Sequence, residues 1–481
     1  MNQATDIFEN LKAPEVEWML STGTERSVAS GEVIITAGKA VDSLYIVLRG
    51  LVGIAAPEFP ERKLAMLGPA EVIGDMTLAE AVVPTESVVA LEESQILALP
   101  HALLNERLKA DPDFAARFFR GLAKLLSNRL RRANAQLAAA LRVGHPSEWV
   151  DGTWRRTAYA VGQIKDRLNE VDQAAIKSRA ELSPDTVNKL VRQLHEFVTF
   201  LEQQIGDAVG ENRRVVEEAG AYVQKEFLPF IWLTENAERM YSKPRGYPGD
   251  YLMIEKIYDN VPRGTGRLGA AIDRSFLESP PCVAVRNRRR LLAEEIQQTV
   301  LNANGESARV TALACGPARE LFDVFQMLED PTRLNATAVD FDPHGLAFVA
   351  ERRDQCALPH TLTLVNENLI SLALGRARTK LTDQDLIYSA GLADYFNDNL
   401  VINLLNSIHA SLRHGGRVLL GNFHPRNPCK AFMEHVLEWR LVHRTEADMN
   451  RLFRASAFGR PCTQIRFEEQ GINLFAECRR E

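Results

Sequence analysis

One segment of this sequence has the pattern of a ligand-binding loop: a buried apolar run, a tight turn and the start of a helix. The stretch VTALACGPARELFDVF, Val310 to Phe325, holds one glycine, Gly316, where loops that cradle a dinucleotide usually hold three. Asp340 ends the next apolar run, and a carboxylate there can accept both hydrogen bonds of a ribose diol. A pyrophosphate would need more bare backbone over the helix N-terminus, so one glycine flanked by Ala314 and Ala318 favours a nucleoside without phosphate.

Phenol, imidazole and guanidinium groups could position an acceptor beside such a nucleoside. RGYPGDY, Arg245 to Tyr251, fits either a loop that presents phenols to a pocket or a tyrosine-rich structural corner. The histidine of GNFHPRNP is either a surface residue or a group at the binding edge of a sheet. The candidates for these roles are Tyr247, Tyr251, Tyr395, His424 and Arg426.

Four arginines lie at the start of the helix predicted from VRNRRRLLAEEI, where the helix dipole disfavours positive charge. Either these side chains are solvated, or some of them bind an anionic ligand. They are Arg286, Arg288, Arg289 and Arg290.

Alternating strands and helices from residue 309 onward predict how these groups come together. The predicted strands cover residues 309–315, 335–342, 361–369, 385–391 and 414–423, with helices over 319–329, 344–355 and 398–413 and a closing hairpin over 462–480. Such alternation predicts a doubly wound sheet that binds ligands at the carboxyl ends of its strands.

Short β-like runs dominate the first hundred residues. GEVIITAGKAVDSLYIVLRG and LGPAEVIGDMTL resemble the cyclic-nucleotide-binding domain family, which implies a jelly-roll β-barrel and a long helix over residues 1–140. Where the family's phosphate-binding cassette has a glutamate this chain has Asp75, and where it has an arginine the chain has Thr85, Glu86 and Ser87. A cyclic phosphate would stay unpaired beside a carboxylate, which is costly. The barrel is therefore either a nucleotide sensor or, as we prefer, a degenerate domain for regulation, dimerisation or another ligand.

An amphipathic helix begins near Asp111. In the resembled cyclic-nucleotide-binding family this helix forms the dimer seam, where two facing apolar stripes would bury each other, and the resemblance therefore implies a homodimer. The stripe consists of Phe114, Phe118, Leu122, Leu125, Leu126 and Leu130.

A helical bundle is expected over residues 141–300. Within it, LSPDTVNKLVRQLHEF looks like the recognition helix of a transcription factor, but no wing follows and its basic residues alternate with acidic ones. We therefore predict an ordinary bundle helix, with Leu190, Leu194 and Phe197 in its core, and no DNA binding.

The C-terminal motifs, taken in order, resemble the class I S-adenosylmethionine-dependent methyltransferases. LACGPARE stands for their glycine-rich loop, VDFDP for their acidic second-strand end, NENL for a contact to adenine and DLIYSAGLADY for the segment after strand four. The resemblance implies a Rossmann-like domain over residues 301–481 and S-adenosyl-L-methionine as cofactor; a catalytically dead or dinucleotide-binding relative is the alternative. It assigns cofactor contacts to Ala314, Cys315, Gly316, Asp340, Phe341, Asn368, Leu369, Ser389, Ala390 and Gly391.

A narrower resemblance covers residues 150–481. RGYPGDYLMIEKIYD, YSAGLADYFND and GNFHPRNPCKAF are similar to bacterial methyltransferases that make 3-hydroxypalmitic acid methyl ester. This implies O-methylation of a fatty-acid carboxylate, which is ionised near neutral pH and needs positioning rather than a base. Catalytic roles then fall to Tyr247, Tyr395 and His424, and substrate contacts to Tyr251 and Arg426. With an amine or hydroxyl acceptor, His424 or Asp394 would be the base.

Composition limits the alternatives. The chain has 481 residues, 46% hydrophobic and 25% charged, and a formal net charge of -6, which offers no basic field for nucleic acid. No run approaches the roughly 20 apolar residues of a membrane span, and the six cysteines form no CxxC pair, so we expect a cytoplasmic protein without a metal site. The fold class predicted is multidomain, α+β followed by α/β. The rival function is a cyclic-nucleotide-type sensor or transcriptional regulator with a non-catalytic Rossmann-like domain.

Overall fold

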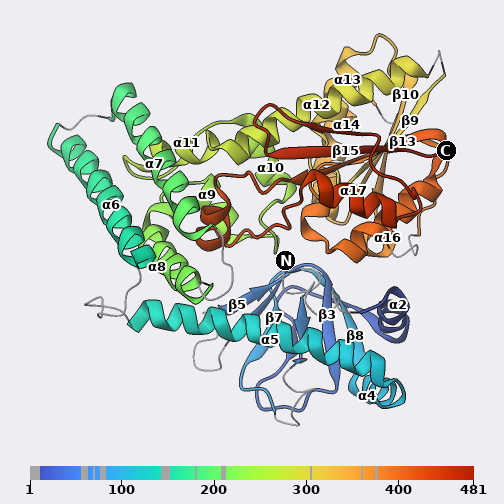
Figure 1. Cartoon of the computed structure of the whole chain (residues 1–481), viewed down its shortest axis with the longest axis horizontal. Coiled ribbons are helices and arrows are strands. Elements are labelled where there is room, and N and C mark those ends of the chain that lie inside the picture. Colours follow the sequence, from blue (N-terminus) through green and yellow to red (C-terminus); the bar gives the residue numbers. More distant parts are fainter. Residues whose placement is uncertain are drawn as a thin grey trace.

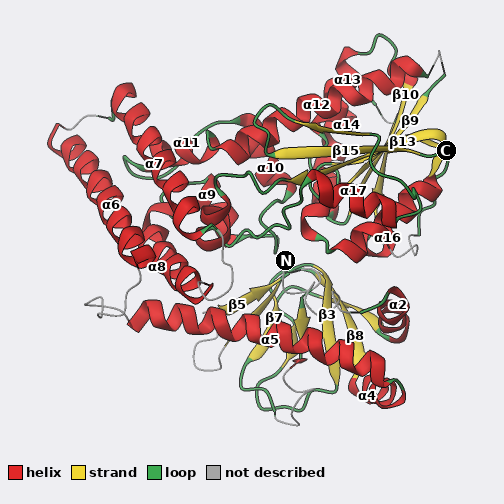
Figure 2. Cartoon of the chain, in the orientation of Figure 1, coloured by secondary structure: helices red, strands yellow, loops and turns green. Residues whose placement is uncertain are grey.

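The computed structural model describes residues 11–55, 63–68, 71–75, 83–141, 152–178, 181–206, 213–303, 306–358, 361–373 and 378–481. An N-terminal domain of β-strands, a group of helices and a C-terminal sheet flanked by helices succeed one another along the chain (Figure 1). Figure 2 shows that strands are confined to the first and the last of these parts. Within the described ranges, no helix combines the length and the apolar character needed to traverse a bilayer.

Two four-stranded antiparallel sheets form the N-terminal domain, in the orders β1-β8-β3-β6 and β2-β7-β4-β5. Along β3 the side chains alternate: Tyr45 and Val47 fill the space between the sheets, and Leu44 and Ile46 face the flanking helices. The predicted barrel is thus present as a β-sandwich. Its elements are α2 (Ala13–Thr22), β1 (Thr24–Val28), β2 (Val33–Ile35), β3 (Ser43–Arg49), β4 (Val52–Ala55), β5 (Lys63–Leu67), β6 (Val72–Ile73), β7 (Ser87–Ala90), β8 (Ser94–Pro100) and α4 (His101–Ala110).

Helix α5 (Pro112–Leu141) uses its apolar stripe within the chain. Phe114, Phe118, Leu122 and Leu125 are buried in one cluster with β-strand residues of the sandwich, while Leu130 is 62% exposed. Four residues of the stripe thus have partners within the chain, and the homodimer stays a prediction, because a stripe reveals that a face is buried but not against what.

Helices α6 to α12 make up the middle of the chain. Ser183 caps α7, its Oγ accepting a hydrogen bond from the Thr186 N–H at 3.2 Å, and Leu190, Leu194 and Phe197 are buried, which confirms the predicted bundle helix. The helices are α6 (Gly152–Ser178), α7 (Pro184–Ile205), α8 (Arg213–Ile231), α9 (Asn236–Ser242), α10 (Tyr251–Asp259), α11 (Gly269–Leu277) and α12 (Pro280–Asn302).

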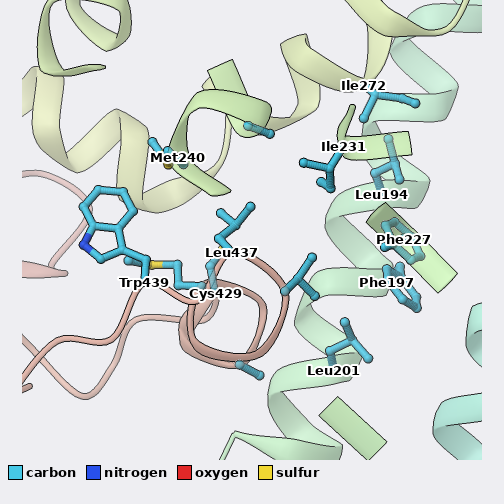
Figure 3. Close-up of a cluster of buried hydrophobic side chains, with 14 of the residues drawn as sticks. Leu194, Phe197, Leu201, Phe227, Ile231, Met240, Ile272, Cys429, Leu437 and Trp439 are labelled. Atoms are coloured by element: carbon cyan, nitrogen blue, oxygen red, sulfur yellow. The ribbon is translucent and has the colours of Figure 1, made fainter. Parts of the chain in front are cut away.

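The core of this helical region also contains a segment from the far end of the chain. Cys429, Leu437 and Trp439 belong to the same buried cluster as Phe197 and Phe227, part of which Figure 3 shows. The domain boundary expected at residue 300 falls within α12, so the helical region and the sheet share both a helix and a core.

Seven strands form the C-terminal sheet in the order β11-β10-β9-β12-β13-β15-β14. The first five are parallel, and β15 runs antiparallel to β13 and β14. Each predicted strand of this region is present: β9 (Ala308–Leu313), β10 (Leu334–Asp340), β11 (Leu362–Asn366), β12 (Gln384–Ser389), β13 (Leu412–Phe423), β14 (Gln464–Phe467) and β15 (Asn473–Arg479).

Helices cover both faces of this sheet. Val310 and Ala312 of β9 point into a core with α12, α13 and α14, and Leu313 points into a second core with α15, α16 and α17. The chain leaves β9 toward β10 and β11 on one side, and returns to β12 and β13 on the other, so a crevice is expected at the carboxyl ends of β9 and β12. The helices are α13 (Arg319–Met327), α14 (Pro343–Gln355), α15 (Leu369–Ala373), α16 (Asp398–Ser411) and α17 (Glu446–Ala455).

Candidate active site

A cavity opens at this crevice and encloses about 960 Å³ of atom-free space, its mouth included. The sheet edge, the helical region and the segment that follows β13 all contribute to its walls. Most of the site residues expected from the sequence line it: Tyr247, Tyr251, Ala314, Cys315, Gly316, Asp340, Phe341, Leu369, Ala390, Gly391 and Tyr395.

The turn between β9 and α13 holds Asp340 at the end of β10. The Gly316 N–H donates to Oδ2 of Asp340 at 2.9 Å, and the Asp342 N–H donates to Oδ1 at 3.0 Å. Gly316 adopts a φ of +54°, and a Cβ placed there would meet nothing within 4 Å. Ala314 and Ala318, where the resembled loop has glycines, also have positive φ, so the backbone keeps a glycine-type turn at some cost in strain.

Burial raises the pKa of Asp340 to about 6, against the lowering effect of the Asp342 and Gly316 N–H donors. The carboxyl is only 6% exposed and lies in the wall of the cavity. A ligand that donates hydrogen bonds to it, such as a vicinal diol, would stabilise its ionised form.

Aromatic side chains form the wall opposite the sheet. Tyr247 packs on Phe341 with ring centroids 5.2 Å apart, and the Trp439 Nε1–H donates to the hydroxyl of Tyr395 at 3.0 Å. A Cβ on Gly249 would lie 2.9 Å from that hydroxyl, so a larger residue at this position of RGYPGDY would displace the Tyr395 side chain. The phenols of this loop thus face the cavity rather than solvent.

Arg288 is a buried cation in the cavity wall that sequence analysis did not single out from its neighbours. It is 6% exposed, and its Nη1 donates to the Ala390 carbonyl at 3.3 Å and to Oδ1 of Asn473 at 3.4 Å. Its Nε makes no hydrogen bond, and no carboxylate of the described residues lies within ion-pair distance. Its hydrogen-bond partners are neutral, and the Glu320 and Asp394 carboxyls of the same cavity act on it only electrostatically, from beyond ion-pair distance. A buried guanidinium without a direct carboxylate partner can bind an anion.

The other arginines of this helix start have partners. Arg289 forms a two-pronged ion pair with Asp323, Arg290 pairs with Glu469, and Arg286 donates to two backbone carbonyls. The sequence motif gave no means to separate Arg288 from them, because all four differ only in the partner they meet.

Glu320 is a second residue that the sequence analysis missed. It lies buried in the first turn of α13, accepts a hydrogen bond from the Tyr388 hydroxyl at 2.8 Å and lines the cavity. Burial raises its pKa. A carboxyl at this helix N-terminus would oppose binding of a pyrophosphate there.

Four of the expected site residues do not line the cavity. Oδ1 of Asn368 accepts the Ile370 N–H at 2.9 Å at the start of α15, and Ser389 donates to the Leu313 carbonyl at 2.8 Å. Nδ1 of His424 accepts the Arg426 N–H at 3.0 Å, so Nε2 carries the proton and faces Glu446 at 3.1 Å. Arg426 has an exposed side chain. His424 and Arg426 therefore stabilise the turn after β13, away from the acceptor space.

Asp394 offers a stability test that depends on pH. Its carboxylate accepts the Phe423 N–H at 2.6 Å, and burial raises its pKa to about 6, above the unfolded value of about 3.9. A raised folded pKa contributes stability at low pH that is lost as pH rises through 6, so from pH 5 to pH 7 wild type should lose about 1 kcal/mol relative to Asp394→Asn. Urea unfolding at both pH values measures the difference. Parallel pH profiles for the two proteins would contradict it.

No group of three or more histidine, cysteine, aspartate or glutamate side chains is placed to hold a metal ion in the described part of the chain. Cys315 is buried in the loop after β9, and burial raises the pKa of its thiol.

Comparison with known proteins divides the chain in two. A family model described as "Cyclic nucleotide-binding domain" matches residues 25–111, and one described as "Putative methyltransferase" matches residues 249–480, from the RGYPGDY loop to the last strand.

The chain is also similar to individual proteins. It is 32% identical over 200 residues to the cyclic AMP receptor protein of Thermus thermophilus, which covers 40% of this chain and 87% of that protein. It is 25% identical over 170 residues to the CRP-like cAMP-activated global transcriptional regulator of Mycobacterium tuberculosis, covering 35% of this chain and 70% of that protein. A solved N-terminal domain of a transcriptional regulator from Streptomyces coelicolor A3(2) is 30% identical, with a TM-score of 0.25 over 28% of this chain and 94% of that domain.

The two family-model matches agree with the two folded parts described above. The chain belongs to the family of the cyclic AMP receptor protein through its N-terminal cyclic nucleotide-binding domain, and this domain is joined to a C-terminal domain of the family described as "Putative methyltransferase".

Proposed function

We propose that the protein is an S-adenosylmethionine-dependent methyltransferase of the class I, Rossmann-like type. The observation that carries this proposal is the buried Asp340 carboxylate at the end of β10, held beside Gly316 at the switch point of the sheet. The strand order from β11 to β13 is that of a doubly wound nucleotide-binding sheet, which binds its ligand at this crevice.

The cofactor assignment rests on what the site offers to each half of a nucleotide. Asp340 would hold the ribose diol, and Phe341 and Leu369 offer apolar surface for adenine. The buried Glu320 at the N-terminus of α13 argues against a dinucleotide, because a pyrophosphate would meet a carboxyl there. When bound, S-adenosylmethionine supplies an electrophilic methyl carbon on a sulfonium sulfur.

The acceptor we propose is the carboxylate of a 3-hydroxy fatty acid or a related small molecule. Apolar side chains from three segments, among them Ile254, Phe423 and Leu441, line the cavity and suit an acyl chain. Arg288 is the cation that would hold the carboxylate in its two-pronged geometry, in place of the role first given to Arg426.

The residues of this chain then act by positioning and by excluding water. A carboxylate oxygen needs no base, so Tyr247 and Tyr395 would orient the acceptor for in-line attack on the methyl carbon while the bond from carbon to sulfur breaks. Their buried aromatic wall keeps water from competing as the nucleophile.

Incubation of a cell extract and purified protein with methyl-labelled cofactor tests the reaction, with mass spectrometry of the products. We expect a labelled fatty-acid methyl ester. Labelled protein or amine would overturn the acceptor, and no labelled product together with no cofactor binding would overturn the enzyme class.

The N-terminal domain is proposed to regulate this activity. The sequence of this domain contains no arginine from Gly68 to Pro100, so the usual partner of a cyclic phosphate is missing from this stretch. A nucleotide remains the second candidate ligand, since the cyclic AMP receptor protein of Thermus thermophilus is among the similar proteins.

A further inference from the structure

One turn of the N-terminal domain lies directly against the loop that lines the cavity. A Cβ placed on Gly68 would lie 2.5 Å from the Gly246 carbonyl oxygen and 3.2 Å from its Cα, so the two backbones are in contact. Gly68 is itself fixed, because its N–H donates to Oε2 of Glu71 at 2.7 Å and its carbonyl accepts the Glu71 N–H at 3.1 Å. The contact thus joins two ordered backbones with no side chain between them.

Gly246 immediately precedes residues that form the cavity wall. Tyr247 packs on Phe341, and Gly249 lies against the hydroxyl of Tyr395. Arg245, on the other side, pairs with Asp342 at 3.5 Å, next to the loop that holds the ribose-binding carboxylate. A shift of Gly246 would therefore displace both the aromatic wall of the cavity and the loop beside the ribose-binding carboxylate.

Glu92 forms a second point of this surface. Burial raises the pKa of its carboxyl, and the ionisable side chains that act on it are Arg245, Asp342 and His344 of the C-terminal part and Arg49 of the N-terminal domain. The N-terminal domain thus faces the cavity loop with two residues, the backbone of Gly68 and the half-buried carboxylate of Glu92. We call these two residues the loop contact.

We propose that the loop contact holds residues 245–250 in their cavity-lining position, so that any event that moves Gly68 in the N-terminal domain changes the affinity of the C-terminal site for its cofactor. The position of Gly68 and the position of the loop are coupled, and this coupling is reciprocal. A cofactor that fixes the loop therefore also fixes Gly68. This proposal rests on the proposed function for the identity of the cofactor, but not for the mechanical link itself.

Gly68→Ala tests the link in the full-length chain. The added methyl group is too close to Gly246 unless the loop moves by several tenths of an ångström, and misplacement on this scale costs binding. We expect about a tenfold higher dissociation constant for S-adenosylmethionine and faster hydrogen exchange of the amides of residues 245–251. Gly162→Ala is the matched control, because a Cβ there meets nothing within 4 Å.

Glu92→Gln keeps the shape of its side chain and tests the same surface without a steric change. Its control is Glu25→Gln, which removes an exposed ion pair with Arg378 between the same two parts of the chain, away from the cavity. We expect Glu92→Gln, and not Glu25→Gln, to change the rate of amide exchange in residues 245–251.

The outcomes separate this link from the proposed function. Unchanged loop exchange and unchanged cofactor affinity in both Gly68→Ala and Glu92→Gln would overturn the link, even if both variants melt at a lower temperature. Faster loop exchange in variants of a protein that never binds S-adenosylmethionine would support the link and overturn the cofactor instead. Protection of the amide of Gly68 on cofactor binding to wild type is the expected reciprocal effect.

Discussion

Asp340→Ala is expected to raise the dissociation constant for S-adenosylmethionine by about 100-fold or more. Hydrogen bonds to a charged group contribute about 1.5–3 kcal/mol each, the ribose diol would make two of them, and 1.4 kcal/mol is a factor of ten. The carboxylate is fixed for this task by the N–H groups of Gly316 and Asp342. Isothermal titration calorimetry measures the loss, and Asp354→Ala, an exposed aspartate of α14, is the control.

The pH dependence of binding supplies an independent check on the same carboxyl. Because burial raises the pKa of Asp340 to about 6 and a diol binds its ionised form, affinity should rise with pH and level off above about 6. Asp340→Asn should bind weakly and with a flat profile. Wild-type affinity for Asp340→Ala, with its fold intact, would remove the basis of the ribose assignment.

Local patterns in the sequence were enough to predict the elements of the C-terminal sheet. Alternating apolar runs, turn residues and amphipathic stretches place each strand within a few residues of its observed bounds, and they place Asp340 at a strand end. Gly316 and Asp340 meet because parallel strands that are neighbours end at the same edge. The order of the strands and the antiparallel insertion of β15 depend on long-range pairing, which no local pattern specifies.

The differences between the expected and the observed surroundings of two groups of residues share one physical cause. His424 follows β13 at the expected edge, but the chain then turns toward α17, whose first residue Glu446 takes the imidazole. Four residues of the α5 stripe are buried, and they pack against the chain's own sandwich. In both cases the residue type and spacing indicated the chemical character of the side chain. Which group it contacts depends on the tertiary fold.

Arg288 is a residue that the sequence pattern could not single out, because its partners too depend on the tertiary fold. Its helix start looked uniformly basic, and only the structure reveals that Arg289 and Arg290 already have carboxylate partners while Arg288 faces the cavity. A buried cation without a direct ion pair costs free energy, which the more distant Glu320 and Asp394 carboxyls offset only in part, and a bound anion would offset the rest. Arg444 gives the contrast: it is also buried, and it donates to Asp398, Asn422 and two backbone carbonyls.

Arg288→Met is expected to lower kcat/KM for the carboxylate acceptor by about 100-fold or more, with little change in the dissociation constant of S-adenosylmethionine. Removing one partner of a buried, hydrogen-bonded charge pair costs about 2–5 kcal/mol. Methionine keeps the length of the side chain in this wall, so the loss reports the guanidinium. Arg288→Lys should recover part of the activity, because it keeps the charge but cannot form the two-pronged contact.

Two carboxylates could meet this guanidinium, that of the acceptor and that of the methionyl part of the cofactor. Steady-state kinetics with the labelled acceptor and calorimetry of the cofactor distinguish them. The control is Arg290→Met, on the same helix but with a side chain that is 61% exposed, which should leave both measurements unchanged. If Arg288→Met instead weakens cofactor binding and leaves the KM of the acceptor unchanged, the guanidinium holds the methionyl carboxylate. The acceptor must then be positioned by the aromatic wall of Tyr247 and Tyr395 alone.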